Sequence, residues 1–134
     1  MPGTRISTGS TWEHRASYAR AVVLPDPGGD WILVSGTTGY DYATGEISAD
    51  PVAQARQCFA NIRGALEQAG AGLADLVRIR VIVTSQSVFD AVIDVIGEHC
   101  RAARPANTTI IAGLVAPEMK VEIEVTARKT PVRS

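Results

Sequence analysis

Side chains that bind metals or act as nucleophiles are scarce in this sequence of 134 residues, which contains two cysteines and two histidines. His14 and His99 have neither the partners nor the spacing of a metal site or a nucleophilic triad. Cys58 and Cys100 fall inside predicted helices among apolar neighbours, where a thiol is usually a small buried hydrophobe rather than a disulfide partner. The sequence therefore predicts neither a metal centre nor a triad hydrolase.

Long apolar runs and an excess of charge are also missing. Stretches such as Ile110–Pro117 are far shorter than the roughly 20 residues that cross a bilayer, and Met1–Arg5 lacks an apolar signal core. The formal net charge is −1, so the surface as a whole does not attract phosphates. These absences predict a cytoplasmic protein that binds neither membranes nor nucleic acid.

The composition is that of an ordinary globular domain. Hydrophobic residues make up 46% of the chain and charged residues 20%, unlike the polar, charge-rich composition of disordered chains. A length of 134 residues suits one domain and is too short for two. Because no repeat or linker interrupts the sequence, residues 1–134 are predicted to form a single domain.

Two strands and one helix are predicted in the first half. Strands are expected over Tyr18–Leu24 and Trp31–Ser35, and the turn-forming residues 25–30 join them as an antiparallel hairpin. Asp50-Pro51 then starts a helix, because the aspartate accepts free amide protons and proline fits the first helical position. Apolar residues recur every three or four positions until Gly70, where the helix is expected to end.

The second half predicts three strands around another helix. A strand is expected over Val77–Thr84, and Ser87–Asp90 resembles a capping box that opens a helix reaching Cys100. Two final strands are expected over Thr108–Leu114 and Val121–Ala127. Helix-linked strands favour parallel pairing and directly linked strands favour antiparallel pairing, so a mixed sheet with both helices on one face is predicted.

Apolar side chains in these strands occupy both faces of the predicted sheet. The runs Trp31–Val34, Val81–Val83 and Ile110–Ile111 all have this character. Two helices cover only one face, and the other would expose a large apolar patch. We therefore expect further copies of the chain to cover the second face.

Short segments along most of the chain resemble the Rid family of reactive intermediate deaminases, also called YjgF-like or RidA-like. Each segment is a weak signal, but their order and spacing are typical of the family. They are Val34-Ser35-Gly36, Gly45-Glu46-Ile47, Gln54-Ala55, Asn61-Ile62, Ala65-Leu66, Ala69-Gly70, Leu73-Ala74-Asp75, Pro105-Ala106 and Lys120-Val121-Glu122-Ile123-Glu124.

The resemblance implies a chorismate-mutase-like α+β fold of the bacillus type. This fold has a mixed six-stranded sheet with two helices on one face, in the order β-β-β-α-β-α-β-β or β-β-α-β-α-β-β. The resemblance also implies a homotrimer with small-molecule sites in the clefts between subunits, and no metal or organic cofactor. Active members hydrolyse enamines and imines derived from amino acids to 2-keto acids and ammonia.

Three positions match residues that line the family's cleft. Glu122 matches the glutamate that positions or activates water, and strand alternation places it on the face opposite Val121 and Ile123. Tyr18 matches a tyrosine near the cleft. Gly36 matches the glycine whose backbone approaches the ligand. Without the resemblance, these would be a solvated glutamate, an amphipathic strand residue and a strand-end glycine.

Three other positions depart from the family. Asn107 follows Pro105-Ala106 where deaminases have an arginine that binds the substrate carboxylate. Ser87 stands where many members have asparagine, and Thr109 where active members often have cysteine. Each charge-assisted bond to a carboxylate contributes roughly 1.5 to 3 kcal/mol, so the sequence predicts weak binding of 2-imino acids.

Another cation is a candidate for the missing role. Arg20 lies two residues after Tyr18, so on one strand both would face the same side; the alternative is an arginine that faces solvent. The sequence does not say whether Trp12-Glu13 closes over the cleft or only packs the N-terminal segment.

Three functions remain open at this point. The first is a hydrolase of small imines or enamines, in which Glu122 directs water and Asn107, Thr109 and Arg20 hold a substrate. The second is a non-catalytic trimer that binds a metabolite and reports it to a partner. The third, a ribonuclease or translation inhibitor, is disfavoured by the near-neutral charge.

Overall fold

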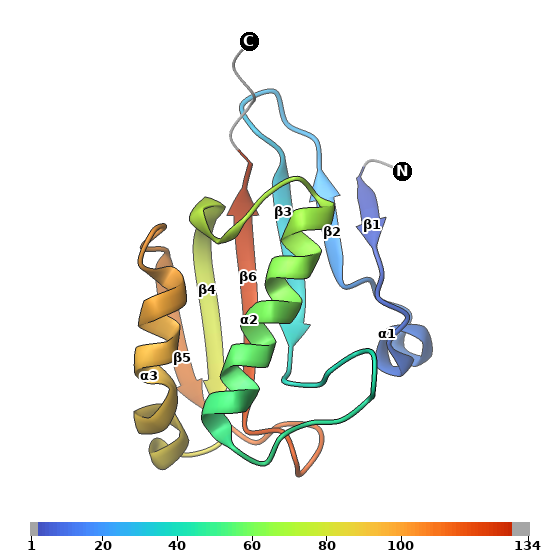
Figure 1. Ribbon diagram of the computed structural model, residues 1–134. Coiled ribbons are helices and arrows are strands. Elements are labelled where there is room, and N and C mark those ends of the chain that lie inside the picture. The colour runs from blue at the N-terminus through green and yellow to red at the C-terminus, as the bar shows by residue number, and fades with distance from the viewer. Residues whose placement is uncertain (1–2, 130–134) are drawn as a thin grey trace.

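A computed structural model describes residues 3–129, which form one mixed sheet with two long helices on one of its faces (Figure 1). The sheet order is β1-β2-β3-β6-β4-β5, parallel between β4 and β5 and antiparallel at every other pairing. The elements are β1 (Thr4–Ile6), α1 (Thr11–Ala16), β2 (Ala21–Leu24), β3 (Trp31–Thr37), α2 (Pro51–Gln68), a 3-10 turn (Leu73–Asp75), β4 (Leu76–Val83), α3 (Gln86–Cys100), β5 (Ala106–Ile111) and β6 (Val121–Arg128).

This arrangement confirms the predicted α+β class and the mixed six-stranded sheet. Three strands precede α2, as in the longer of the two predicted orders. The short helix α1 between β1 and β2 was not predicted. Within residues 3–129, no helix is both long enough and apolar enough to cross a bilayer.

Helix α2 begins and ends where local chemistry predicts. The Asp50 side chain accepts a hydrogen bond from the Ala53 amide at 3.2 Å, and Pro51 occupies the first turn. Gly70, at φ +76°, lies just beyond the helix in the left-handed region that glycine adopts most readily. Both predicted boundaries are therefore confirmed to within two residues.

The predicted cap of α3 is wrong by two positions. Ser85 is the capping residue, because its extended backbone lets its hydroxyl accept the Val88 amide at 3.2 Å. Ser87 instead lies in the first turn and is exposed.

Two strand predictions also need correction. The stretch around Tyr18 is not a strand, because α1 ends at Ser17 in a left-handed conformation and β2 begins only at Ala21, which pairs with Ile6. Strand β5 begins at Ala106 rather than Thr108, since its parallel ladder with β4 starts directly after the proline.

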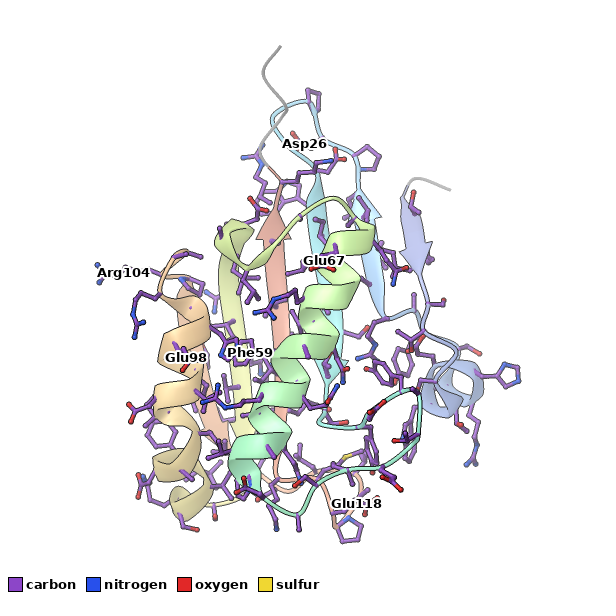
Figure 2. All side chains as sticks on the ribbon, viewed as in Figure 1. Asp26, Phe59, Glu67, Glu98, Arg104 and Glu118 are labelled. Carbon is purple, nitrogen blue, oxygen red and sulfur yellow. The ribbon has the colours of Figure 1, made fainter. Side chains whose placement is uncertain are left out.

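The core lies between the two long helices and the sheet (Figure 2, Phe59 labelled). His99 stacks on the Phe59 ring at 4.3 Å between centroids, and its Nδ1 lies 2.7 Å from the Val95 carbonyl oxygen, which indicates a structural role. Both cysteines are free; Cys58 is fully buried, and burial raises the pKa of its thiol. This confirms its interpretation as a small core hydrophobe.

The second face of the sheet mixes apolar and charged side chains. Leu24 of β2 and Leu33 of β3 are 37% and 44% exposed there, while Ile32 and Val34, the neighbours of Leu33 in β3, are buried against the helices. Arg80 and Glu124 lie on the same open face as register partners. The open face of one chain is therefore amphipathic rather than uniformly apolar.

Candidate ligand cleft

Strand alternation in β6 places Glu122 on the open face of the sheet. Val121 and Ile123 are fully buried on the helix side, whereas Glu122 is half-buried on the other side. Its carboxyl group lies against Gly36 of β3, near a register irregularity between Val34 and Thr37. A Cβ at Gly36 would lie 2.9 Å from the Glu122 Cδ atom, so only glycine leaves the carboxyl group in this position.

The surroundings of Glu122 make its carboxyl group a weaker acid than usual. Burial is the main cause of the raised pKa, and the nearby Glu124 charge adds to it. Arg20 and Arg80 act in the opposite direction without cancelling the rise. A half-buried carboxyl group with a raised pKa holds its proton more tightly than a free carboxyl group does, which suits a residue that takes up and returns a proton during a reaction.

Glu122 forms one wall of a cleft of about 660 Å³ at the lower end of the sheet as drawn in Figure 1. Helix α1, the end of β3, the following loop and the segment before β6 supply the other walls. The lining residues are Gly9, Ser10, Thr11, Trp12, Tyr18, Arg20, Ser35, Gly36, Thr38, Tyr40, Asp41, Tyr42, Gly45, Val115, Met119 and Glu122. The structure therefore gathers four of the predicted site residues: Tyr18, Arg20, Gly36 and Glu122.

Arg20 is buried, and the surrounding protein already engages its guanidinium group. Nε donates to Glu13 at 3.3 Å, Nη1 donates to the Gly36 carbonyl and the Thr37 hydroxyl at 2.8 Å each, and Nη2 donates to the Tyr18 hydroxyl at 3.3 Å. The two charged side chains are only 3% and 5% exposed. The prediction that Arg20 shares a strand with Tyr18 is wrong, and so is the alternative of a solvent-facing arginine.

Helix α1 answers the question left open about its tryptophan and glutamate. The Ser10 hydroxyl accepts the Trp12 amide at 3.2 Å and starts the helix. Glu13 turns inward to Arg20 and also accepts from the Thr8 amide and hydroxyl at 3.1 and 2.6 Å. Trp12 remains 45% exposed beside the cleft. The glutamate thus fixes α1 against the sheet while the tryptophan borders the cleft.

The loop after β3 contributes two tyrosines that sequence reasoning missed. Asn61 of α2 donates to the carbonyls of Thr38 and Tyr40 at 3.2 and 2.8 Å and holds this loop against the helix. The Tyr40 hydroxyl donates to Glu118 at 2.5 Å, and burial, with help from this contact, raises the pKa of Tyr40 to about 12. Burial likewise raises the pKa of Tyr42.

Buried Gln54 links that loop to the segment before β6. Its amide nitrogen donates to the carbonyls of Ser48 and Glu118 at 2.7 and 2.9 Å, and its oxygen accepts the Lys120 amide at 2.9 Å. Gly39 packs directly on the Gln54 backbone, where a Cβ would come within 2.8 Å. The segments Gln54-Ala55 and Asn61-Ile62 contributed to the family resemblance, but nothing in the sequence indicated that Gln54 and Asn61 hold the loops around the cleft.

The other predicted site residues lie elsewhere in the chain. Asn107 of β5 pairs with Ile79 of β4 and, together with Arg104, lines a shallow opening of about 450 Å³ beside the end of α3. Thr109 donates to the Asn107 side chain at 2.8 Å. Ser87 is exposed at the start of α3. Figure 2 shows Arg104, which lies beside Asn107, far from Glu118, which flanks the cleft. Within one chain, Asn107 and Thr109 therefore do not meet the residues of the cleft.

The fold and the cleft define a class of protein: a small α+β domain with a carboxylate cleft on the open face of its sheet. The family model described as Endoribonuclease L-PSP matches residues 8–129. The chain therefore belongs to this family, which also carries the names YjgF, RidA and RutC, and the predicted resemblance is confirmed.

Relatives are similar along almost the whole chain. The uncharacterized protein SCO2049 of Streptomyces coelicolor is 32% identical over 133 residues, covering 97% of this chain and 95% of that protein. A 2-iminobutanoate/2-iminopropanoate deaminase of Dermatophagoides farinae is 28% identical over 124 residues, covering 92% and 94%. The crystal structure of Rv2704 from Mycobacterium tuberculosis, a YjgF/YER057c/UK114 family member, matches with a TM-score of 0.80 at 37% identity, covering 94% and 98%.

Proposed function

We propose that this protein hydrolyses small imines or enamines, with Glu122 directing the attacking water. The observation that carries the proposal is the half-buried Glu122 carboxyl group, held against the glycine backbone of Gly36 inside a cleft and with a raised pKa. Relatives named 2-iminobutanoate/2-iminopropanoate deaminase, from Dermatophagoides farinae and Escherichia coli, support this reaction class.

The reaction needs one group that accepts a proton and later returns it. The water oxygen bonds to the imine carbon while Glu122 takes a proton from the water, and the imine nitrogen gains a proton from solvent. Glu122 then returns its proton to that nitrogen. The C–N bond breaks, ammonia leaves, and the remaining hydroxyl group loses its proton as the carbonyl forms. Only water is consumed, and a carboxyl group with a raised pKa suits both steps.

We propose further that the working unit is a homotrimer, in which the cleft around Glu122 in one subunit meets Asn107 and Thr109 of a neighbouring subunit. Asn107 and Thr109 lie on β5, an edge strand of the sheet, and Leu24 and Leu33 expose apolar area on the open face. A neighbouring subunit that covers this face could bring its β5 to the cleft. Light scattering of the purified protein tests the subunit number.

Glu122→Gln tests the catalytic role. Removal of a general acid–base group typically costs about 10²- to 10⁴-fold in rate, so release of ammonia from an enzymatically generated imine should fall by that amount. Glu67→Gln is the matched control, because Glu67 is exposed on α2 and does not line the cleft, and it should keep the activity. Equal losses in both variants would remove Glu122 from the mechanism.

The alternative is a trimer that binds a metabolite without turning it over. The hydrogen bonds that engage Arg20, together with Asn107 in the place of the family's arginine, favour it, because they leave little to hold a substrate carboxylate. If the wild-type protein hydrolyses neither 2-imino acids nor imines without a carboxylate, while a metabolite raises its melting temperature, the alternative is correct.

A further inference from the structure

Aromatic side chains are concentrated in the cleft. The whole sequence holds two tryptophans, three tyrosines and two phenylalanines. One tryptophan and all three tyrosines, Trp12, Tyr18, Tyr40 and Tyr42, line this one cleft. Trp12 and Tyr18 are 45% and 38% exposed, so large parts of these side chains are open to contact. Aromatic walls of this kind bind flat apolar groups and, by cation–π attraction, flat cations.

The charges that line the cleft favour the same kind of ligand. Asp41 and Glu122 contribute two carboxyl groups. Arg20 is the one cationic residue among the lining side chains of residues 3–129, and its charge is matched by buried Glu13. Arg80 also acts on Glu122; it lies with Glu124 in an adjoining depression on the open face, which shares Gly36 and Glu122 with the cleft. Among the described residues that line the cleft itself, an entering carboxylate therefore meets two carboxyl groups and one cation, Arg20, whose charge is already matched by Glu13.

We propose, building on the function above, that the cleft selects a flat nitrogen compound that is uncharged or cationic and lacks a carboxylate, such as an aryl-substituted imine or iminium. The aromatic side chains hold the flat body, and the carboxyl groups of Asp41 and Glu122 accept N–H hydrogen bonds from the C=N group. Hydrolysis of the iminium follows the same route: water adds to the carbon, the C–N bond breaks, and a carbonyl compound and ammonium are released.

Three probes of nearly identical shape test this selectivity: benzamidine as the cation, benzamide as the neutral form and benzoate as the anion. Binding is measured by calorimetry at pH 7 on the intact protein. We expect benzamidine to bind at least tenfold more tightly than benzoate, with benzamide between them. Equal or tighter binding of benzoate, or no binding of any probe at millimolar concentration, would overturn the proposal.

Variants locate the binding and assign its cause. Trp12→Ala should weaken benzamidine and benzamide severalfold, whereas Trp31→Ala, which removes the other tryptophan from β3 outside the cleft, should change neither. Glu13→Gln should free the Arg20 charge and tighten benzoate severalfold. If that variant fails to fold, Asp41→Asn serves instead and should reduce the preference for benzamidine over benzoate. An unchanged preference in the folded variant would contradict the charge argument.

The hydrolase function and the ligand class of the cleft can fail independently in these experiments. Turnover of 2-imino acids together with a preference for benzoate would preserve the hydrolase function and defeat the ligand class. The predicted order of probe binding, without hydrolysis of any imine, would preserve the ligand class and defeat the hydrolase function.

Discussion

The cleft around Glu122 and the corner of the sheet around Asn107 are built in different ways. In the cleft, Arg20 donates four hydrogen bonds and Gln54 connects two loops, and both side chains are buried. At the corner, Asn107 is exposed beside Thr109, and Ile111 is 55% exposed on the same edge strand. One chain therefore fixes the buried side chains of the cleft through its own hydrogen bonds, whereas Asn107 and Ile111 at the corner are exposed.

The largest expected effect tests whether the cleft depends on its buried ion pair. Arg20→Ala leaves the Glu13 carboxylate buried without its partner, which typically costs about 3–5 kcal/mol of unfolding free energy. Urea denaturation should show this loss. Arg56→Ala is the matched control, because it breaks an exposed ion pair with Glu98 and should change the midpoint little. Similar midpoints for both variants would mean that the cleft does not depend on Arg20.

The second prediction addresses the open corner. Asn107→Arg restores the cation that the family resemblance places after Pro105-Ala106, and a charge-assisted carboxylate bond is worth roughly 1.5–3 kcal/mol. If β5 of a neighbouring subunit meets the cleft, kcat/KM for a 2-imino acid should rise about 10- to 100-fold. Turnover of an imine without a carboxylate should stay the same. The control is Arg104→Ala, which removes an exposed arginine at the same corner.

The sequence predicted the cleft's β-strand parts better than its loop parts. The family resemblance pointed to Glu122 and Gly36, and strand alternation, which is a local signal, placed Glu122 on the face opposite Val121 and Ile123. The position of Arg20 depends on Glu13 and on the β3 backbone, and no spacing rule connects these. Helix α1 has six residues and ends at a serine in the left-handed region, where glycine would have been the recognisable signal.

The same contrast holds for the fold. Asp50 and Pro51 mark a helix start through chemistry within one turn, so that boundary was predictable. Tyr42 and Gln54 depend on packing between segments far apart in the sequence, so neither could be assigned a role. The separation of Asn107 from Glu122 depends on sheet order, with β4 between their strands, which the element order alone does not specify.

A smaller effect is expected where β3 approaches Glu122. Gly36→Ala places a methyl group where the Glu122 carboxyl group now lies, and the flexible end of the glutamate side chain can move to relieve the contact. Activity should fall about tenfold through misplacement of the carboxyl group, with little loss of stability. Gly64→Ala in α2, where nothing lies near the added carbon, should leave activity unchanged. Unchanged activity of Gly36→Ala would show that the contact with Gly36 does not set the position of Glu122.

The smallest effect concerns the pH dependence of stability. The folded protein raises the pKa of Glu122 above the ordinary glutamate value of 4.5, so the folded state binds this proton more tightly than the unfolded chain. Wild-type stability relative to Glu122→Gln should therefore be undiminished below pH 4.5 and should fall as the pH rises through the raised pKa. Melting temperatures from pH 4 to 8 should diverge, with the glutamine variant more stable at neutral pH. Exposed Glu67 on α2 (labelled in Figure 2) gives the control, since Glu67→Gln should not produce that divergence. Parallel melting curves for wild type and Glu122→Gln across this range would mean that the cleft does not desolvate its carboxyl group, and the acid–base role would lose its physical basis.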